Sequence, residues 1–173
     1  MFAPDGRIAA RYDKIHLFDV DLPDGGRVRE SEAYEGGGHL AMADAPFGRL
    51  GLTICYDMRF PALFRALAMQ GCGIITVPSA FTVPTGEAHW HVLLRARAIE
   101  TGSFILAAAQ GGVHESGRAT FGHSLAVEPW GEVIAEGGTG PEALVFEIDG
   151  NSVDVARSKI PVLSHSRHFG LKG

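Results

Sequence analysis

The sequence predicts a mixed α/β fold that forms one domain over residues 1–173, because strand-like and helix-like segments alternate along the chain. Two segments, 49–55 and 74–77, are short and mostly apolar, which is typical of buried strands. Two others, 61–70 and 87–101, carry apolar residues at helical spacing. A length of 173 residues without an internal repeat or a linker is usual for a single domain with a sizeable core.

The N-terminal part of the chain is divided by loop signals. Residues 7–12 follow a Pro4-Asp5-Gly6 turn and are expected to form a strand. Residues 14–20 lead into a loop marked by Pro23-Asp24-Gly25-Gly26, and a second loop is expected at Gly36-Gly37-Gly38.

The middle of the chain predicts two strand–helix units. The strand over 49–55 ends at a thiol, and Pro61 suits the first turn of the following helix, where its missing N–H has no partner to lose. The segment 74–77 is mostly β-branched and predicts a central strand. The next helix, over 87–101, has an apolar face and a C-cap at Gly102; the face comprises Trp90, Leu93, Leu94, Ala98 and Ile99.

The remainder of the chain predicts mainly β-structure. The strand candidates are 104–109, 123–127, 132–135 and 143–148. A turn at Pro129-Trp130-Gly131-Glu132 is expected to join two of them as a hairpin. Asn151 is expected to cap a last helix that ends near Lys159. Beyond Pro161 there is no periodicity, so we expect an extended tail that lies on this chain or on another subunit.

Composition excludes several classes of partner. The net charge of −5 is spread along the chain without a basic block, which argues against nucleic acid. The sequence contains no apolar run of the roughly 18 residues that span a membrane and no N-terminal targeting pattern, so a cytoplasmic location is expected. Two cysteines without a Cys-x-x-Cys pair indicate neither a disulfide framework nor zinc. The spacings His89/His91 and His165/His168 lack acidic or cysteine companions, and no metal is expected.

Cys55 is the most informative single residue. It follows the apolar run 50–54 and precedes a polar turn and Pro61, an arrangement that presents a side chain at the end of a strand. Free cysteine is also among the most buried residue types, so position alone leaves a packed thiol as an alternative. Cys72, between Gly71 and Gly73, is expected to pack at the edge of a strand.

Five motifs follow one another in the chain: Tyr12-Asp13-Lys14-Ile15-His16-Leu17-Phe18, Cys55-Tyr56-Asp57-Met58-Arg59-Phe60-Pro61, Gly86-Glu87-Ala88-His89-Trp90, Arg95-Ala96-Arg97-Ala98-Ile99-Glu100 and Gly122-His123-Ser124. Together they closely resemble the carbon–nitrogen hydrolases of the nitrilase superfamily over nearly the whole chain. Within that family the segments 78–81, 93–101 and 107–110 look most like the amidase branch that hydrolyses deaminated glutathione.

The resemblance implies a four-layer α-β-β-α sandwich. It also implies a catalytic Glu, Lys and Cys in that chain order, of which Lys14 and Cys55 match the last two. The first Glu, the general base, has no counterpart, because none of the thirteen residues before Lys14 is a glutamate. We therefore expect the N-terminal strands and helices of the family unit to be missing from this chain, which would correspond to its larger, C-terminal part.

The resemblance further implies hydrolysis of a small-molecule amide, an ω-amide such as deaminated glutathione, to an acid and ammonia through a thioester. In that reaction Cys55 is the nucleophile, Lys14 and the backbone N–H of Tyr56 meet the oxyanion, and Glu30 supports Lys14. Substrate contacts are expected from a second group of residues, namely Arg59, Phe81, His89 and Trp90. The resemblance implies no metal or organic cofactor. It implies a homodimer or a larger homo-oligomer.

Three other functions remain open on the sequence. One is a Cys-His hydrolase in which His89 or His123 is the base. Another is a catalytically inactive remnant or interaction module of the same fold, which the absent base favours. The third is hydrolysis of a nitrile or an N-carbamoyl group within the same superfamily.

Overall fold

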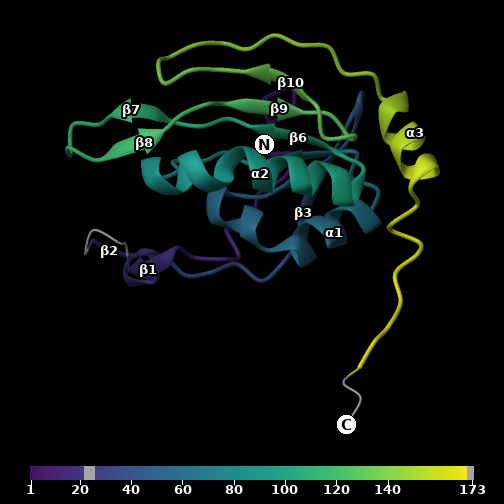
Figure 1. Cartoon of the computed structure of the whole chain (residues 1–173), viewed down its shortest axis with the longest axis horizontal. Helices are drawn as coiled ribbons and strands as arrows, with labels where there is room; N and C mark the ends of the chain where they lie inside the picture. The colour runs from purple at the N-terminus through teal and green to yellow at the C-terminus, as the bar shows by residue number, and fades with distance from the viewer. Residues whose placement is uncertain (22–25, 171–173) are drawn as a thin grey trace.

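A six-stranded sheet forms the centre of the computed structural model, which describes residues 1–21 and 26–170 (Figure 1). Its strands lie in the order β10-β9-β6-β5-β4-β3. Their bounds are β3 Ala41–Ala45, β4 Gly48–Leu52, β5 Ile74–Thr76, β6 Phe104–Ala107, β9 Leu125–Val127 and β10 Val133–Glu136. The strands β4, β5 and β6 are parallel, and the other neighbours are antiparallel. The mixed α/β fold class is confirmed.

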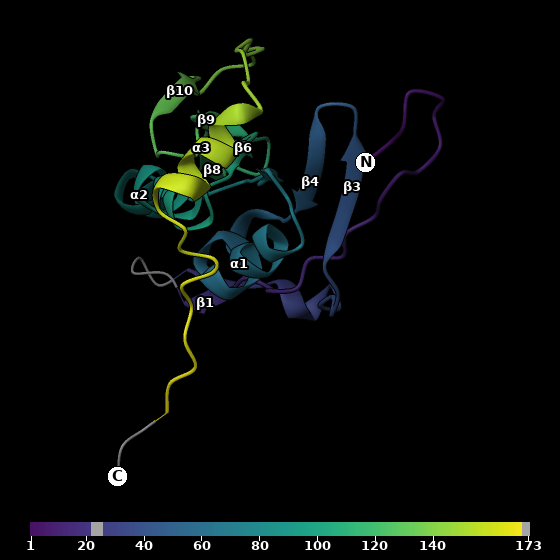
Figure 2. The same cartoon turned by 90° about the vertical axis from the view of Figure 1, so that its right-hand side faces the viewer.

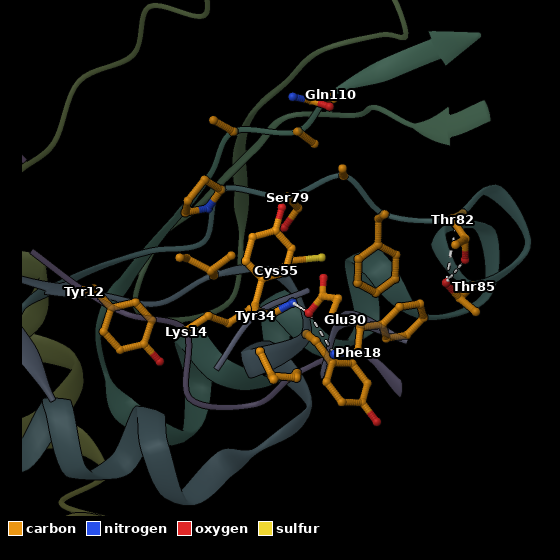
Figure 3. Close-up of a pocket in the computed structure, with 18 of the residues that line it drawn as sticks. Tyr12, Lys14, Phe18, Glu30, Tyr34, Cys55, Ser79, Thr82, Thr85 and Gln110 are labelled. Atoms are coloured by element: carbon orange, nitrogen blue, oxygen red, sulfur yellow. Dashed lines mark hydrogen bonds and ion pairs between the residues drawn. The ribbon is translucent and has the colours of Figure 1, made fainter. Parts of the chain in front are cut away.

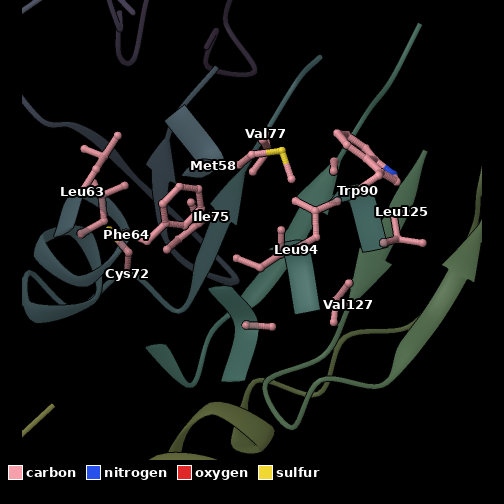
Figure 4. Close-up of a cluster of buried hydrophobic side chains, with 14 of the residues drawn as sticks. Met58, Leu63, Phe64, Cys72, Ile75, Val77, Trp90, Leu94, Leu125 and Val127 are labelled. Atoms are coloured by element: carbon pink, nitrogen blue, oxygen red, sulfur yellow. The ribbon is translucent and has the colours of Figure 1, made fainter. Parts of the chain in front are cut away.

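One face of this sheet is covered by helices α1 (Pro61–Met69) and α2 (Val83–Thr101). Successive strand residues point to opposite faces, so Ile75 and Ile105 face the helices while Ile74 and Phe104 face away. The helical face holds the main core, shown in Figure 4, whose largest fully buried side chains include Trp90, Phe64, Met58, Leu67 and Leu94. The described residues thus form one sheet layer and one helix layer of the expected sandwich.

Helix α3 (Asn151–Lys159) packs at the other side of the sheet, where Val153 joins a smaller cluster with Ile74 and Phe104 (Figure 2). Arg157 anchors this helix. Its guanidinium donates to the carbonyl oxygens of Thr101 and Cys72 at 3.1 and 2.8 Å. These contacts hold α3 against the corner between α2 and β6.

Two hairpins flank the sheet. The hairpin of β7 (Gly111–Val113) and β8 (Ala119–Phe121) extends beyond β6 (Figure 1). The strands β1 (Asp19–Asp21) and β2 (Arg27–Arg29) pair with each other, and a 3-10 helix, η1 (Glu30–Glu32), follows them. A second 3-10 helix, η2 (Cys55–Arg59), connects β4 to α1.

Several element predictions agree with the structure. The strand expected over 49–55 is β4, which ends at Leu52, and the central strand over 74–77 is β5. Pro61 begins α1, as expected. Gly102 follows α2 with a φ of 57°, the left-handed conformation that a glycine C-cap adopts.

Other element predictions are wrong. Residues 7–12 form no strand. Their β-pairing is limited to one isolated bridge, between Ile8 and Phe2 near the N-terminus of the chain. Residues 143–148 form no strand either: they pair with none of the strands in the described part of the chain, and Val145 is 95% exposed. Asn151 is the first residue of α3 instead of its cap, and its N–H is bound by the Asp149 carboxylate at 2.9 Å.

Three further features differ from the expectation or fall outside it. Helix α2 begins at Val83, four residues before the expected start, because the turn at Thr82 already directs the chain into the helix. Strands β1, β2, β3, β7 and β8 were not predicted. The loop expected at Pro23-Asp24-Gly25-Gly26 lies almost wholly outside the described residues. Beyond Pro161 the chain extends away from the domain (Figure 2), and the carbonyl of Leu163 accepts a hydrogen bond from Arg65.

Candidate active site

A cavity of about 830 Å³ lies at the carboxyl ends of β4, β5 and β6. The segments that follow these strands, 54–56, 78–82 and 108–110, all line it. The carboxyl ends of parallel strands meet at one edge of a sheet, which is where ligand sites of open α/β folds form. Residues 12–18 and 30–35 close the opposite wall.

Cys55 lies in this cavity at the first position of η2 (Figure 3). Its N–H donates to the carbonyl of Pro78 at 3.0 Å, which ties it to the end of β5. Its φ is 48°, in the left-handed region that non-glycine residues seldom adopt and that costs about 1–3 kcal/mol. Such conformations concentrate at functional sites.

The packed-thiol interpretation fits Cys72 instead. Cys72 is fully buried in the main core, and burial raises the pKa of its thiol. Cys55 is only partly buried and borders the cavity. The fold therefore presents one thiol and encloses the other.

The side chains of Lys14 and Glu30 form an ion pair at the wall facing Cys55 (Figure 3). The distance from Lys14 Nζ to Glu30 Oε2 is 2.5 Å, and the Lys14 side chain is 12% exposed. The same Glu30 oxygen accepts the N–H of Phe18 at 2.8 Å. Glu30 thus fixes the ammonium group in place.

The other predicted site residues divide into two groups. Tyr56 and Phe81 line the cavity with Cys55. The N–H of Tyr56 belongs to the first turn of η2, where backbone donors have no acceptor within the helix. Arg59 and His89 do not line the cavity: the Arg59 guanidinium lies 3.3 Å from His89 Nδ1.

Trp90, also expected to contact substrate, is fully buried in the core behind Phe81. The centroids of the two rings lie 5.2 Å apart. The indole N–H donates to the carbonyl of His123 at 2.7 Å, so the one polar atom of this large side chain is satisfied inside the core. Trp90 therefore supports a wall of the cavity and does not form its surface.

Sequence reasoning missed the residue that joins the two halves of the site. Asp57, in η2, is fully buried, and its carboxylate accepts the hydroxyl of Tyr12 at 2.8 Å and the N–H of Ile54 at 2.9 Å. The backbone N–H and ring Nδ1 of His16 contact its other oxygen at 3.1 and 2.8 Å. The signal was present in the sequence, since Tyr12 and His16 flank Lys14 and Asp57 follows Cys55 by two positions.

The histidines required by a Cys-His mechanism lie elsewhere. Neither His89 nor His123 lines the cavity, and His123 is bound to Glu136 at 3.1 Å. Over the described part of the chain, no group of three His, Cys, Asp or Glu side chains is arranged to hold a metal ion. The cavity that holds the Cys55 thiol is thus lined by the Lys14 ammonium and the Glu30 carboxylate and, among the described residues, by no histidine.

Comparison with known proteins agrees with this geometry. The family model described as carbon-nitrogen hydrolase matches residues 1–158. The chain belongs to the carbon-nitrogen hydrolase family.

Curated relatives of this carbon-nitrogen hydrolase include several proteins called deaminated glutathione amidase. The protein from Yersinia enterocolitica is 54% identical over 168 residues, which cover 96% of this chain and 59% of the relative. The human protein is 48% identical over 163 residues, which cover 94% of this chain and 50% of the relative. The chain thus spans about half to three fifths of the length of these two relatives.

Solved structures share the fold of this carbon-nitrogen hydrolase. The NitFhit protein of Caenorhabditis elegans aligns with a TM-score of 0.87 and 45% identity, covering 96% of this chain and 40% of that one. A member of branch 10 of the nitrilase superfamily from Saccharomyces cerevisiae aligns with a TM-score of 0.81 and 34% identity, covering 91% and 55%. A third structure is a variant of the amidase from Nesterenkonia sp. AN1, with an acetamide moiety added covalently at its active-site cysteine. It aligns with a TM-score of 0.72 and 27% identity, covering 90% of this chain and 52% of that one.

The resemblance to the nitrilase superfamily is thereby confirmed. None of the helices over residues 1–21 and 26–170 is long and apolar enough to cross a bilayer.

Proposed function

We propose that this chain carries the nucleophile and the oxyanion-binding groups of an amide hydrolase. The observation that supports the proposal is that the strained residue Cys55 and the Lys14–Glu30 ion pair line the same cavity. A thiol, a fixed cation and a free backbone donor are the groups that acyl transfer through a thioester needs.

The first half-reaction follows from these groups. The thiolate of Cys55 adds to the amide carbonyl carbon, and the electron pair of the C=O bond moves to oxygen. Lys14 Nζ and the Tyr56 N–H stabilise this oxyanion, and one such donor contributes about 3–4 kcal/mol in other enzymes. When the C=O bond re-forms, the C–N bond breaks, and the leaving nitrogen takes up the proton that Cys55 lost on forming its thiolate. Ammonia departs, and an acyl thioester remains on Cys55.

The second half-reaction needs a carboxylate that activates water. The resemblance assigns this step to a glutamate that precedes Lys14, and residues 1–13 contain none. Glu30 is engaged by Lys14 and by the N–H of Phe18, and the other described carboxylates of the cavity wall, Asp13 and Glu35, are not in the chain position of that glutamate. We therefore expect the 173-residue chain to form the thioester faster than it releases the acid. An inactive remnant, by contrast, would form no adduct at all.

The proposed substrate class is a small ω-amide, with deaminated glutathione as the leading member. Support comes from the relatives that bear the name deaminated glutathione amidase at 54% and 48% identity. A nitrile or N-carbamoyl substrate is the alternative within the family. It would give a different adduct mass on Cys55.

The compartment and the assembly are also proposals. The partly exposed thiol of Cys55 must stay reduced to react, which a cytoplasmic location provides. A homodimer would cover apolar side chains of α2 that face outward, among them Val92 and Ile99, which are 68% and 52% exposed. Light scattering would measure the molar mass.

The decisive experiment is intact-protein mass spectrometry after incubation with a primary ω-amide and, separately, with deaminated glutathione. We expect an acyl adduct on the wild-type chain and on Cys72→Ala, and none on Cys55→Ala. Lys14→Met should slow adduct formation by about 10²–10³-fold, the effect of one oxyanion donor. Lys159→Met, which removes an equal charge far from the cavity, should not. An adduct that persists in Cys55→Ala would refute the proposal.

A further inference from the structure

We propose that Arg118 binds an anionic group of the substrate, so that the cavity selects amides that carry a carboxylate away from the amide to be cleaved. This inference rests on the proposed function and names the specificity-determining residue of the same site. Arg118 lies in the turn before β8 and lines the cavity with Cys55.

The first argument is the state of its charge. Among the described residues, two cations line the cavity, Lys14 and Arg118. Lys14 is neutralised by Glu30 at 2.5 Å. The Arg118 side chain donates only to a backbone carbonyl, that of Ala80, at 3.1 Å, and across residues 1–21 and 26–170 it has no carboxylate within ion-pair distance. A guanidinium has five N–H donors, so most of its capacity remains for a carboxylate.

The second argument is its position relative to the thiol. The N–H and C=O of Ser79 bond to Ala108 and Gln110 on the β6 side. Backbone groups alternate in direction along an extended segment. The carbonyls of the two neighbours of Ser79 therefore face the opposite side, where Pro78 binds the Cys55 N–H and Ala80 binds Arg118.

This arrangement sets a distance. Two residues of extended chain span about 6.5 Å. Arg118 is thus anchored roughly that far along the wall from the point at which Cys55 is anchored, on the same side of the segment. A carboxylate separated from an amide carbon by a few methylene groups spans such a distance.

The third argument is the distribution of charge over the walls. The carboxylates that line the cavity, Asp13, Glu30 and Glu35, all come from the N-terminal wall. Arg118 comes from the β7–β8 hairpin at the other wall. An anionic substrate group is therefore repelled by one wall and attracted by the other, which orients the amide within the cavity.

The hairpin holds Arg118 firmly enough for this task. The N–H of Phe121 donates to the carbonyl of Phe81 at 2.9 Å, and Thr120 bridges to Thr82. The carbonyl of Arg118 itself accepts the N–H of His114 at 2.9 Å, which closes the turn. These backbone bonds fasten the hairpin to the segment that carries Ala80.

A pair of thiol reagents tests the inference without requiring turnover. N-ethylmaleimide is neutral, and 3-maleimidopropionate carries a carboxylate at the end of a similar chain. We expect the rate ratio of the anionic to the neutral reagent at Cys55, measured by peptide mass spectrometry, to fall about threefold to tenfold in Arg118→Gln. Arg118→Lys should recover part of the wild-type rate ratio. The rate with the neutral reagent should be the same in the wild type and in both variants.

The matched control is Arg7→Gln, which removes an equal charge from an exposed residue outside the cavity. An unchanged ratio in Arg118→Gln, or an equal fall in both variants, would overturn the inference. If Cys55 reacts with neither reagent, the site is not open and the inference also fails. If the ratio falls as expected but no amide acylates Cys55, Arg118 binds anions and only the proposed amide hydrolysis is wrong.

Discussion

The hydroxyl of Tyr12 donates a 2.8 Å hydrogen bond to the buried carboxylate of Asp57. This bond joins two segments that are 45 residues apart, one carrying Lys14 and the other Cys55. Burial, together with the hydrogen bond to Asp57, raises the pKa of the Tyr12 hydroxyl well above its usual range, so it remains a donor at every physiological pH. The relative position of the cation and the thiol depends on this contact.

Removing the Tyr12 hydroxyl tests that dependence. Tyr12→Phe should lower the free energy of unfolding by about 1–3 kcal/mol, because a buried carboxylate loses a donor. It should also slow alkylation of Cys55, since Lys14 is held less well. Urea denaturation and the alkylation rate measure the two effects. Tyr34→Phe, at a residue that is 69% exposed, is the control for the unfolding measurement; an equal loss of stability in both variants would contradict the role of Asp57.

The two thiols should differ in reactivity. In the native protein, N-ethylmaleimide should modify Cys55 and leave Cys72 unmodified, because Cys72 is fully buried and burial raises the pKa of its thiol. In denaturant both should react. Peptide mapping by mass spectrometry gives the two rates. Equal native rates would show that the core around Cys72 opens as readily as the cavity.

The support behind Phe81 can be weakened directly. Trp90→Phe removes the hydrogen bond to the His123 carbonyl and leaves a gap in the core, so we expect a loss of about 2–4 kcal/mol in the free energy of unfolding. Trp130→Phe, at a ring that is 54% exposed, should cost less than about 1 kcal/mol. Thermal or urea unfolding measures both. Similar losses would mean that Trp90 is not a structural anchor.

Glu136 should make stability depend on pH. Burial acts to raise the pKa of its carboxyl, but hydrogen bonds from His91 and His123 outweigh it and lower the pKa below the usual value of 4.5. Because the pKa is lower in the folded than in the unfolded state, Glu136 stabilises the folded protein at pH values above its unfolded-state pKa. This stabilisation is lost as the pH falls through the folded-state pKa. The effect should be modest, because the side chain is 38% exposed.

The variant Glu136→Gln should therefore be less stable than the wild type at pH 7, and the difference should shrink as the pH falls below about 4.5. Urea midpoints at several pH values measure this. Glu147→Gln makes the same change of charge at an exposed residue and should show no such pH dependence. A difference that stays constant with pH would refute the expectation.

The elements predictable from sequence are those whose local pattern and tertiary setting agree. Strand β5 and helix α1 were expected because branched residues and a first-turn proline favour those conformations by themselves. Residues 143–148 have the same alternation as a strand, yet within residues 1–21 and 26–170 they pair with no other strand. Pairing is a long-range property that a single segment does not encode.

The same distinction holds for the site. Cys55 and Lys14 belong to motifs, Glu30 was implied by the resemblance, and the structure brings all three to one cavity. Trp90 and Arg59 belong to motifs as well, but they point into the core or toward His89. Arg118 was missed because it lies in no motif and enters the cavity only through the β7–β8 hairpin, which sequence reasoning did not predict.

The left-handed backbone at Cys55 has a consequence for how the chain changes under mutation. Glycine adopts a φ of 48° without strain, so Cys55→Gly should relieve a conformational penalty of about 1 kcal/mol or more at the position of the thiol. Stability alone would thus favour replacing the residue. A cysteine at this strained position is therefore explained by a function of its thiol and not by stability. This reasoning does not depend on any contact that the thiol makes in the cavity.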